Sequence, residues 1–359
     1  MTANPEMVTL AREFRGLTQE ELARLLGVSQ ARIARIEGGV LEASPTMLDM
    51  LSDALQFPTA FFFLEENRLG FGSSAYFYRK RSELSATDRR RIHGLVNVLR
   101  ISIKKFIDFV EIEGKKPLPS WELSDYGNSP RKIAEALRGL WQMPDGPVND
   151  LTKLLEAAGV IVVSCDFGTR SMDATSMRLA EMPPLIFIND AIPGDRWRFT
   201  LAHELMHLVC HQVPSETMED EADEFAAEFL LPELEMRAQF SRYPKLRLID
   251  FANLKQYWKT SMGALIERAR SLNCLDDNQR RYLWMTMSKL GYRLQEPHPI
   301  EKEQPKSLHR VVQHFISELG YGQSDMEKLL RLNRQELQSL FGVSATGASP
   351  VRRQVRAVR

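Results

Sequence analysis

The spacing of apolar residues along the chain predicts a mostly helical protein with a small amount of sheet. Residues 4–64 have the pattern of several short helices, and apolar residues recur at helical spacing again from 91 to 110. Two continuous apolar runs, at 160–163 and 185–188, have the length and the β-branched content of buried strands. The remaining helical patterns lie at 130–141, 148–158, 195–212, 217–231 and 247–345, the last with a break at 296–305.

Breaks between these patterns divide the chain into five predicted segments. A chain of 359 residues exceeds one typical core, which favours two or three folded domains. The predicted fold class is multidomain and mainly α, with an N-terminal helical bundle, an α+β domain with a small β-sheet, and a helical C-terminal region. The segments are the bundle at 1–68, a basic helical connector at 69–120, the α+β domain at 121–246, the helical region at 247–343 and a disordered tail at 344–359.

The composition is that of a soluble globular protein, with 43% apolar and 26% charged residues. No apolar stretch approaches the roughly 18 residues that a membrane span needs, and the first ten residues lack the pattern of a signal peptide. Three scattered cysteines, Cys165, Cys210 and Cys274, argue against a disulfide framework and favour a reducing, cytoplasmic setting. Because 47 basic residues balance 47 acidic ones, any contact with nucleic acid must depend on a local surface.

The segment from 16 to 39 has the signals of two short helices joined by a tight turn. Thr18 and Glu21 form a capping box that starts the first helix. Gly27 ends this helix, because glycine adopts the left-handed backbone conformation at little cost. Ser29 then caps a second helix over 30–37. The side chains expected to pack inward are Leu22, Leu25, Leu26, Ile33 and Ile36.

The second helix of such a pair lies outward, where it can enter a major groove of DNA. Its exposed polar residues are predicted to be Gln30, Arg32 and Arg35, side chains that pair with adenine, guanine or phosphate. Gln19, at the start of the preceding helix, is placed for a contact with the DNA backbone. Residues 1–70, however, hold six basic and ten acidic residues, a net charge near −4, which favours the alternative of a bundle for dimerisation or partner binding.

His203, Glu204 and His207 form an H-E-x-x-H motif within a helical pattern. Four residues make just over one helical turn, so both imidazoles project from one face and can bind one zinc ion. Glu204 lies beside them, where it can polarise a water molecule rather than bind the metal. A metzincin would have glycine at 210 and histidine at 213, and the chain has Cys210 and Val213 instead.

The third metal ligand is therefore expected from a carboxylate on the next helix. Glu219 and Asp223 are four residues apart, on one face of that helix. Glu219 is predicted to be the ligand, and Asp223 to accept the other ring N–H of a ligating histidine. Glu221, on a different side, is the alternative ligand, and a solvated helix N-terminus would by itself favour all three carboxylates. His211, one turn after the motif, is predicted to lie beside the site, where it could donate a proton.

Two segments resemble known families. The pattern GLTQEELARLLGVSQARIARIEGG resembles the Xre/Cro-type repressors over about residues 6–64, which implies a DNA-binding helix-turn-helix domain. The residues RFTLAHELMHL, followed by EADEFAAEFLLP and preceded by LIFIND, resemble the ImmA/IrrE zinc metallopeptidases over about residues 150–235. The second resemblance implies a zincin-like domain of the gluzincin type. Members of that family cleave phage or stress-response repressors that are themselves helix-turn-helix proteins, so the resemblance implies a repressor as the substrate.

These features predict a cytoplasmic DNA-binding regulator that carries a zinc metallo-endopeptidase domain. Its expected partners are double-stranded DNA and a protein substrate, without membrane association, and the helix-turn-helix favours a homodimer on a two-fold site. The strand at 185–189 is expected to hold an extended peptide by strand addition. The alternative is a transcription factor or antitoxin whose metal-binding domain serves as a sensor or dimerisation module without peptide hydrolysis.

Overall fold

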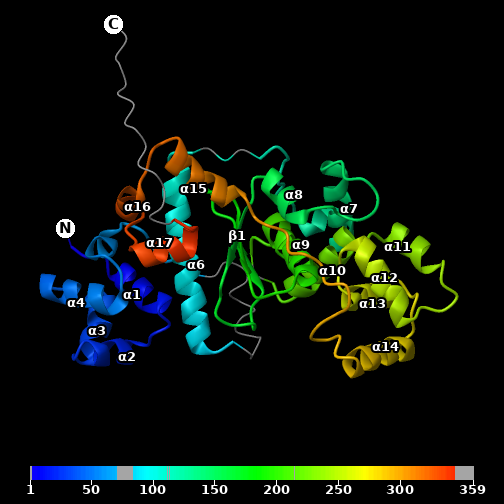
Figure 1. Cartoon of the computed structure of the whole chain (residues 1–359), viewed down its shortest axis with the longest axis horizontal. Coiled ribbons are helices and arrows are strands. Elements are labelled where there is room, and N and C mark those ends of the chain that lie inside the picture. The colour runs from blue at the N-terminus through cyan, green and yellow to red at the C-terminus, as the bar shows by residue number, and fades with distance from the viewer. Residues whose placement is uncertain (1, 71–83, 111, 113, 214, 344–359) are drawn as a thin grey trace, which may run out of the picture.

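The computed structural model of the chain describes residues 2–70, 84–110, 112, 114–213 and 215–343. The N-terminal helices lie at one end of the molecule, a small sheet lies in the middle, and helices from the second half of the chain form the other end (Figure 1). The fold is mainly helical, which confirms the predicted fold class. The predicted tail at 344–359 and the part of the predicted connector at 71–83 lie outside the described residues.

The N-terminal bundle is built from short helices that begin at side-chain caps. Thr18 accepts a backbone hydrogen bond from Glu21 and closes the predicted capping box, and Ser29 caps the second helix of the pair. Gly27 has a φ of 64°, as a left-handed turn between these two helices requires. The bundle consists of α1 (Pro5–Phe14), α2 (Gln19–Leu25), α3 (Gln30–Glu37), α4 (Pro45–Leu55) and the 3-10 helix η1 (Thr59–Phe63).

One predicted core position of this bundle is wrong. Leu25 is 63% exposed, whereas Leu22, Ala23 and Leu26 are buried. Consecutive residues are about 100° apart around a helix, so Leu25 points in a different direction from Leu26 and away from the rest of the bundle. Ile33 and Ile36 are buried, as predicted, and leave the polar residues of α3 on the outside.

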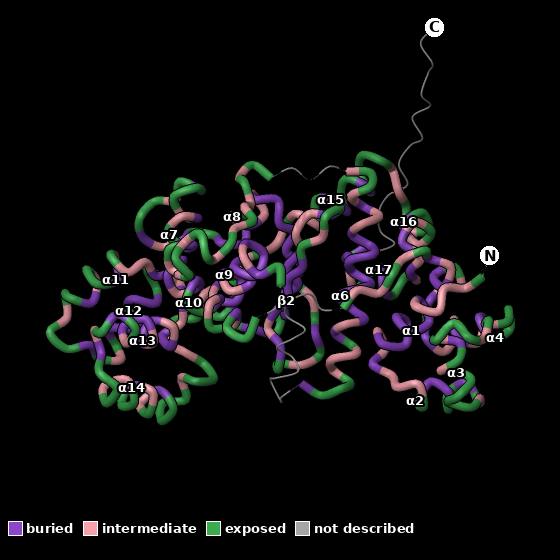
Figure 2. The backbone as a smooth tube through the Cα atoms, turned by 180° about the vertical axis from the view of Figure 1, so that it is seen from behind, coloured by how far each residue is buried: buried purple, intermediate pink, exposed green. Residues whose placement is uncertain are grey.

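A long helix, α6 (Ala86–Ile107), connects the bundle to the rest of the protein. Most of its residues between 92 and 106 are buried (Figure 2), so the helical part of the predicted connector belongs to a hydrophobic core. It lies along α1, and Gly94 makes the contact close: a Cβ at this position would lie 2.3 Å from the backbone nitrogen of Phe14. The absence of a side chain at Gly94 therefore fixes the distance between the two helices.

The sheet has three strands, β1 (Ile161–Cys165), β2 (Ala174–Met177) and β3 (Leu185–Asn189), in the order β1-β3-β2. β1 and β3 are parallel, while β2 and β3 are antiparallel with Ser176 opposite Ile186. The apolar runs predicted β1 and β3, but not the short and more polar β2. Because β3 is central and both of its edges are paired, the prediction that it binds a peptide by strand addition is wrong; β2 is the edge strand on that side.

Helices surround the sheet and place the candidate site next to it. The long helix α9 (Gly194–Cys210) contacts β2, β3 and α10 (Met218–Leu230). The helix before the sheet, α8 (Leu151–Ala157), also packs against α9. The other helices in this half of the molecule are η2 (Leu123–Tyr126), α7 (Pro130–Leu140), α11 (Glu233–Phe240), α12 (Leu248–Trp258), α13 (Met262–Ser271) and α14 (Asp277–Lys289).

The helices of the predicted region 247–343 divide between two cores. Helices α12 to α14 pack with α9 and α10, whereas α15 (Ser307–Ser317), α16 (Gln323–Leu330) and α17 (Arg334–Phe341) pack with α6 and the N-terminal bundle. The segment between them crosses α9, held by ion pairs of Glu296 with the buried Lys255 and of Glu303 with the buried Arg198. Among the described residues, no helix is both long enough and apolar enough to span a membrane.

Candidate metal centre and helix-turn-helix surface

Three of the predicted site residues meet between α9 and α10. His203 and His207 lie one turn apart on α9, and their Nε2 atoms are 3.1 Å from each other. The carboxylate of Glu219, in the first turn of α10, faces both nitrogens: one of its oxygens lies 3.5 Å from Nε2 of His203 and the other 3.5 Å from Nε2 of His207. Apolar residues on the remaining faces of both helices are buried in the core, which holds the polar faces against each other. The ligand atoms all lie within 4.8 Å of one another and could hold a metal ion.

The spacing of these atoms fits a small tetrahedral metal ion. Zinc binds imidazole nitrogen and carboxylate oxygen at about 2.0–2.1 Å, so two ligand atoms of a tetrahedral site lie about 3.3 Å apart. The two Nε2 atoms are 3.1 Å apart, and each of them has an oxygen of Glu219 at 3.5 Å, so these separations are close to that value. Two neutral imidazoles and one carboxylate are also a donor set that suits zinc.

The two other acidic candidates on α10 contact histidines from outside the cluster. Asp223 accepts a hydrogen bond of 2.8 Å from Nδ1 of His203, which is the contact predicted for it. Glu221 lies 2.9 Å from Nε2 of His211 and does not reach the three-residue cluster, which removes it as the alternative ligand in this arrangement. The sequence thus predicted which face of α10 meets the motif.

Glu204 lies in the same turn of α9 and is almost fully buried, with 5% of its surface exposed. Burial raises the pKa of this carboxyl to about 6, although the positive charge of His203 and a hydrogen bond from Ser176 oppose the increase. Its Oε2 atom has no hydrogen-bond partner among the described residues. An unpartnered carboxylate oxygen with a pKa near neutrality is the property that a general base requires.

The two histidines of the motif differ in their electrostatics. Burial lowers the pKa of His203, but its hydrogen bonds to Asp223 and Glu219 outweigh burial and raise the pKa to about 10. The pKa of His207 is lowered well below its usual value by burial and by the neighbouring imidazoles of His203 and His211. The pKa values of the two imidazoles are thus shifted in opposite directions, because His203 has a carboxylate hydrogen-bonded to its Nδ1 whereas His207 has another imidazole there.

A cavity of about 730 Å³ opens beside His207. Apolar side chains from the end of β2 and from the segment that follows it make up much of its wall, including Met177, Leu179 and Met182. Leu69, from the end of the N-terminal bundle, closes another side. The cavity thus extends from the end of β2 to His207, one of the three clustered residues.

Two polar residues near the cavity already have hydrogen-bond partners. The guanidinium of Arg178 donates to the backbone carbonyls of Leu118, Pro119 and Leu208. His211 lies beside the site, as predicted, with one ring nitrogen toward His207 and the other toward a carboxylate, and its role as a proton donor stays a prediction. Ser176 is the one residue here that sequence reasoning missed, since a serine in a four-residue strand carries no signal.

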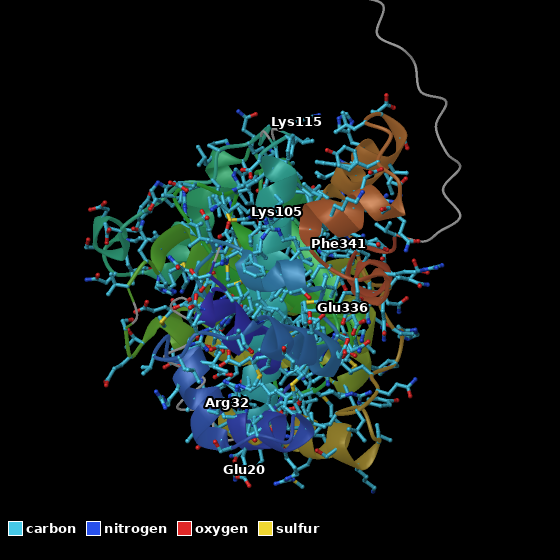
Figure 3. All side chains as sticks on the ribbon, turned by 90° about the vertical axis from the view of Figure 1, so that its left-hand side faces the viewer. Glu20, Arg32, Lys105, Lys115, Glu336 and Phe341 are labelled. Atoms are coloured by element: carbon cyan, nitrogen blue, oxygen red, sulfur yellow. The ribbon has the colours of Figure 1, made fainter. Side chains whose placement is uncertain are left out.

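The predicted DNA-contact residues lie on the outer side of the N-terminal bundle. Gln30, Arg32 and Arg35 are exposed on α3, and Figure 3 shows Arg32 at the edge of the bundle. Gln19, at the start of α2, is half-buried and accepts a 2.9 Å hydrogen bond from Gln30. Their contact with DNA stays a prediction.

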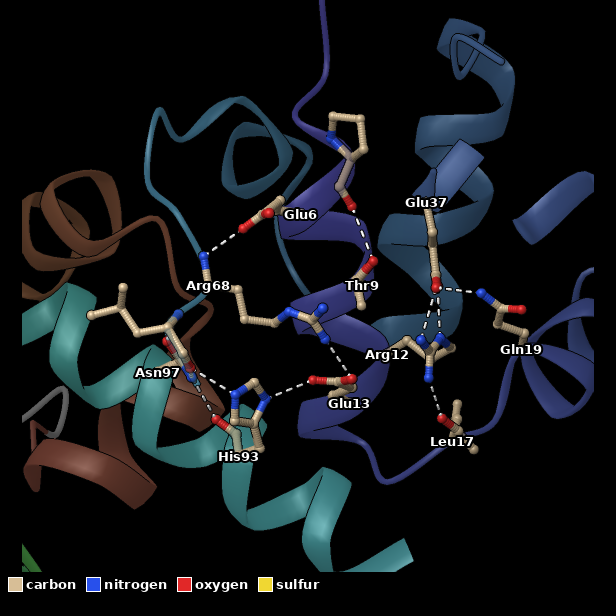
Figure 4. A network of polar contacts seen from close by, with 12 residues as sticks. Glu6, Thr9, Arg12, Glu13, Leu17, Gln19, Glu37, Arg68, His93 and Asn97 are labelled. Carbon is tan, nitrogen blue, oxygen red and sulfur yellow. Dashed lines mark hydrogen bonds and ion pairs between the residues drawn. The ribbon is translucent and has the colours of Figure 1, made fainter. Parts of the chain in front are cut away.

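A buried ion pair fixes the orientation of this surface. The guanidinium of Arg12 on α1 donates two hydrogen bonds, of 2.6 and 2.7 Å, to the carboxylate of Glu37 at the end of α3 (Figure 4). The same carboxylate accepts a hydrogen bond of 2.9 Å from Gln19. The amide of Gln19 is therefore held by two partners, and α1, α2 and α3 meet at one carboxylate.

Comparison with known families agrees with the architecture. A family model described as a helix-turn-helix matches residues 10–62, and one described as an IrrE N-terminal-like domain matches residues 155–270. The first match covers most of the N-terminal bundle, and the second covers the sheet, α9, α10 and the helices up to α13. No curated protein matches the chain. The chain therefore joins an Xre-type helix-turn-helix domain, of the class that binds DNA, to a domain of the IrrE/ImmA-like metallopeptidase family.

Proposed function

We propose that the protein is a DNA-binding transcriptional regulator whose second domain is a zinc metallo-endopeptidase that cleaves a repressor-type protein. The observation that carries this proposal is the cluster of His203, His207 and Glu219 with the buried carboxylate of Glu204 beside it, whose Oε2 atom has no hydrogen-bond partner among the described residues. A domain that used the metal only as a structural support would not need a base of raised pKa next to the ligands.

His203, His207 and Glu219 would hold the zinc ion, which supplies Lewis acidity and lowers the pKa of a water molecule at the site. Glu204 accepts a proton from the attacking water and passes it to the leaving amine. Burial raises the pKa of this carboxyl, which favours its protonation after the attack on the peptide bond. Ser176, on β2, keeps the Glu204 carboxylate oriented.

The substrate would bind as an extended segment along β2, on the side away from β3, so that β2 takes the role predicted for β3. Main-chain hydrogen bonds of strand addition hold a peptide without regard to its sequence. The apolar cavity beside His207 then accepts one side chain close to the scissile bond, with Met177, Leu179 and Met182 against it. This arrangement favours a large apolar residue in the substrate next to the cleaved peptide bond.

The helix-turn-helix would bind double-stranded DNA through α3. Gln30, Arg32 and Arg35 project from it, and Gln19 contacts the DNA backbone at the start of α2. A homodimer on a two-fold DNA site fits this class of domain, and a cytoplasmic location fits both activities.

A second candidate function is a metal-dependent sensor without hydrolysis. The observation that favours it is a direct contact between the N-terminal bundle and α17: Arg15, which follows α1, forms an ion pair of 2.5 Å with Glu336. Helix α17 shares its core with α6, and α6 contacts α1, so these packed helices could transmit a conformational change near the sheet to the N-terminal bundle.

Two measurements test the proposal and separate it from the sensor. Elemental analysis should find about one zinc per chain in the wild type and none in His203→Ala or Glu219→Ala; no zinc in folded wild type would overturn the metallopeptidase reading. Zinc-loaded wild type and Glu204→Gln are then incubated with an extract of the source organism, and new protein N-termini are compared. New N-termini that arise with wild type alone support hydrolysis. Identical sets of N-termini from both proteins would contradict hydrolysis and favour the sensor function.

A further inference from the structure

His207 has a second set of contacts on the side away from the metal cluster. Its Nδ1 atom lies 2.8 Å from Nδ1 of His211, and Nε2 of His211 lies 2.9 Å from a carboxylate oxygen of Glu221. The hydroxyl of Thr217 donates a hydrogen bond of 2.6 Å to the other oxygen of Glu221. His211, which follows the last residue of α9, is only 8% exposed, so its ring is fixed by its surroundings.

Only one arrangement of protons satisfies all of these contacts when Nε2 of His207 faces a metal ion. A metal-binding nitrogen must offer its lone pair, so the proton of neutral His207 must be on Nδ1. Nδ1 of His211 then has to accept this hydrogen bond, which leaves the proton of His211 on Nε2. That proton is donated to Glu221, a carboxylate that can only accept.

The other tautomer of His207 is unfavourable for the same reason. With its proton on Nε2, His207 would have a lone pair on Nδ1, and His211 would have to donate from its own Nδ1. Nε2 of neutral His211 would then carry a lone pair facing the carboxylate of Glu221 at 2.9 Å, without a proton between them. Repulsion between two acceptors at this distance would disfavour that arrangement, so Glu221 selects the tautomer of His207 through His211.

We propose that His211 and Glu221 are positioning residues that hold His207 in its metal-binding tautomer and orientation. They do for His207 what Asp223 does for His203, but with one imidazole interposed. Glu219 and Glu221 both belong to the first turn of α10, so a single turn provides a ligand and the carboxylate behind another ligand. This inference rests on the proposed metal site and adds a requirement for its affinity.

The test is the zinc affinity of the full chain, measured by competition with a chromophoric chelator. Loss of an outer hydrogen-bond partner of a ligating histidine typically weakens metal binding about 10- to 100-fold, and we expect His211→Leu to weaken the zinc Kd within that range. His211→Asn places an amide oxygen near the position of Nδ1 and should recover part of the loss. Glu221→Gln, which removes the charge but keeps an acceptor, should fall between wild type and His211→Leu.

Asp220→Asn is the matched control, because Asp220 is exposed in the same turn and the substitution removes the same charge. Its zinc Kd should stay within about twofold of wild type, which separates a local contact from a general effect of acidic residues. Thermal unfolding of the metal-free variants checks that each one is folded. If His211→Leu does not fold, the comparison of Glu221→Gln with Asp220→Asn decides the question.

The zinc measurements distinguish an error in the positioning role from an error in the proposed function. If wild type binds zinc, and His211→Leu and Glu221→Gln bind it with the same affinity, the positioning role is wrong and the metal site remains. Zinc that is retained in Glu219→Ala but lost in His211→Leu would also overturn it, because His211 would then be a ligand. Wild type without zinc would instead contradict the proposed function itself.

Discussion

The ion pair between Arg12 and Glu37 offers a direct test of how the DNA-binding surface is held together. Both side chains are about 95% buried, with relative exposures of 6% and 5%, and two short hydrogen bonds join them. Replacing Glu37 with leucine leaves the guanidinium of Arg12 buried, with only the carbonyl of Leu17 as a remaining acceptor. Breaking one partner out of a buried pair costs about 3–5 kcal/mol, because an uncompensated charge stays in the core.

The size of this effect can be separated from simple loss of packing by a double-mutant cycle. Arg12→Met and Glu37→Leu each remove one charge, and together they replace the pair with apolar groups of similar volume. We expect each single variant to lose about 3 kcal/mol of unfolding free energy, and the double variant to lose much less than the sum, since no charge is left unpaired. A loss of 3 kcal/mol lowers the folding equilibrium constant by a factor of roughly 150.

Urea unfolding followed by circular dichroism measures these free energies, and the exposed Glu42 provides the control. Glu42→Leu should change the stability by less than about 0.5 kcal/mol. Additive losses in the Arg12 and Glu37 variants, or a loss below 1 kcal/mol for Glu37→Leu, would refute the reasoning. Since Glu37 also holds Gln19, the same variant should weaken binding to a duplex probe even where the bundle remains folded.

Three further predictions concern the metal site, pH and packing. Asp223→Asn should raise the zinc Kd about 10- to 100-fold, because the ring of its histidine partner loses a charged acceptor. Glu224→Gln on the same helix should leave the Kd unchanged, and equal Kd values for the two variants would contradict the assigned contact. Burial raises the pKa of Glu13, but hydrogen bonds from a histidine and an arginine outweigh it and lower the pKa below 4.5. A depressed carboxyl pKa stabilises the fold fully above the unfolded value and less as pH falls through the folded value. The stability difference between wild type and Glu13→Gln should therefore shrink below about pH 4.5, and a constant difference would count against this. Gly94→Ala should lower the free energy of unfolding by about 1–3 kcal/mol or more, since the new methyl group would meet backbone atoms. Gly139→Ala, with open space around it, should be neutral or slightly stabilising. Similar Tm values for the two variants would contradict the packing argument.

Features that depend on a few consecutive residues were predictable from the sequence. The capping box at Thr18 and the span of α3 follow from contacts within one helical turn, and the structure has both as predicted. The spacing of His203 and His207 likewise defines one face of a helix wherever that helix lies. Local geometry decides these features, and the printed sequence contains all of it.

Features that depend on distant partners were not predictable in the same way. β2 has four residues and a polar pair, Thr175 and Ser176, and it becomes a strand because β3 offers it an unpaired edge. The helices at 307–341 have the same amphipathic pattern as those at 248–289, yet they pack on the opposite side of the sheet. Periodicity shows that a helix has an apolar face, but it does not identify the surface that covers that face.

The acidic turn at the start of α10 shows where these two kinds of information meet. Glu219 and Asp223 are four residues apart and lie about 40° from each other around the helix, whereas Glu221 lies about 160° from both, so the sequence separates them into two sides. It does not show that His211 bends back from the end of α9 to stand between Glu221 and His207. A carboxylate on the wrong side for a ligand thus contacts the metal cluster through an interposed imidazole. The side of the helix alone would assign Glu221 to solvent, and the contact between the two histidines is the reason to expect a change in metal affinity when it is replaced.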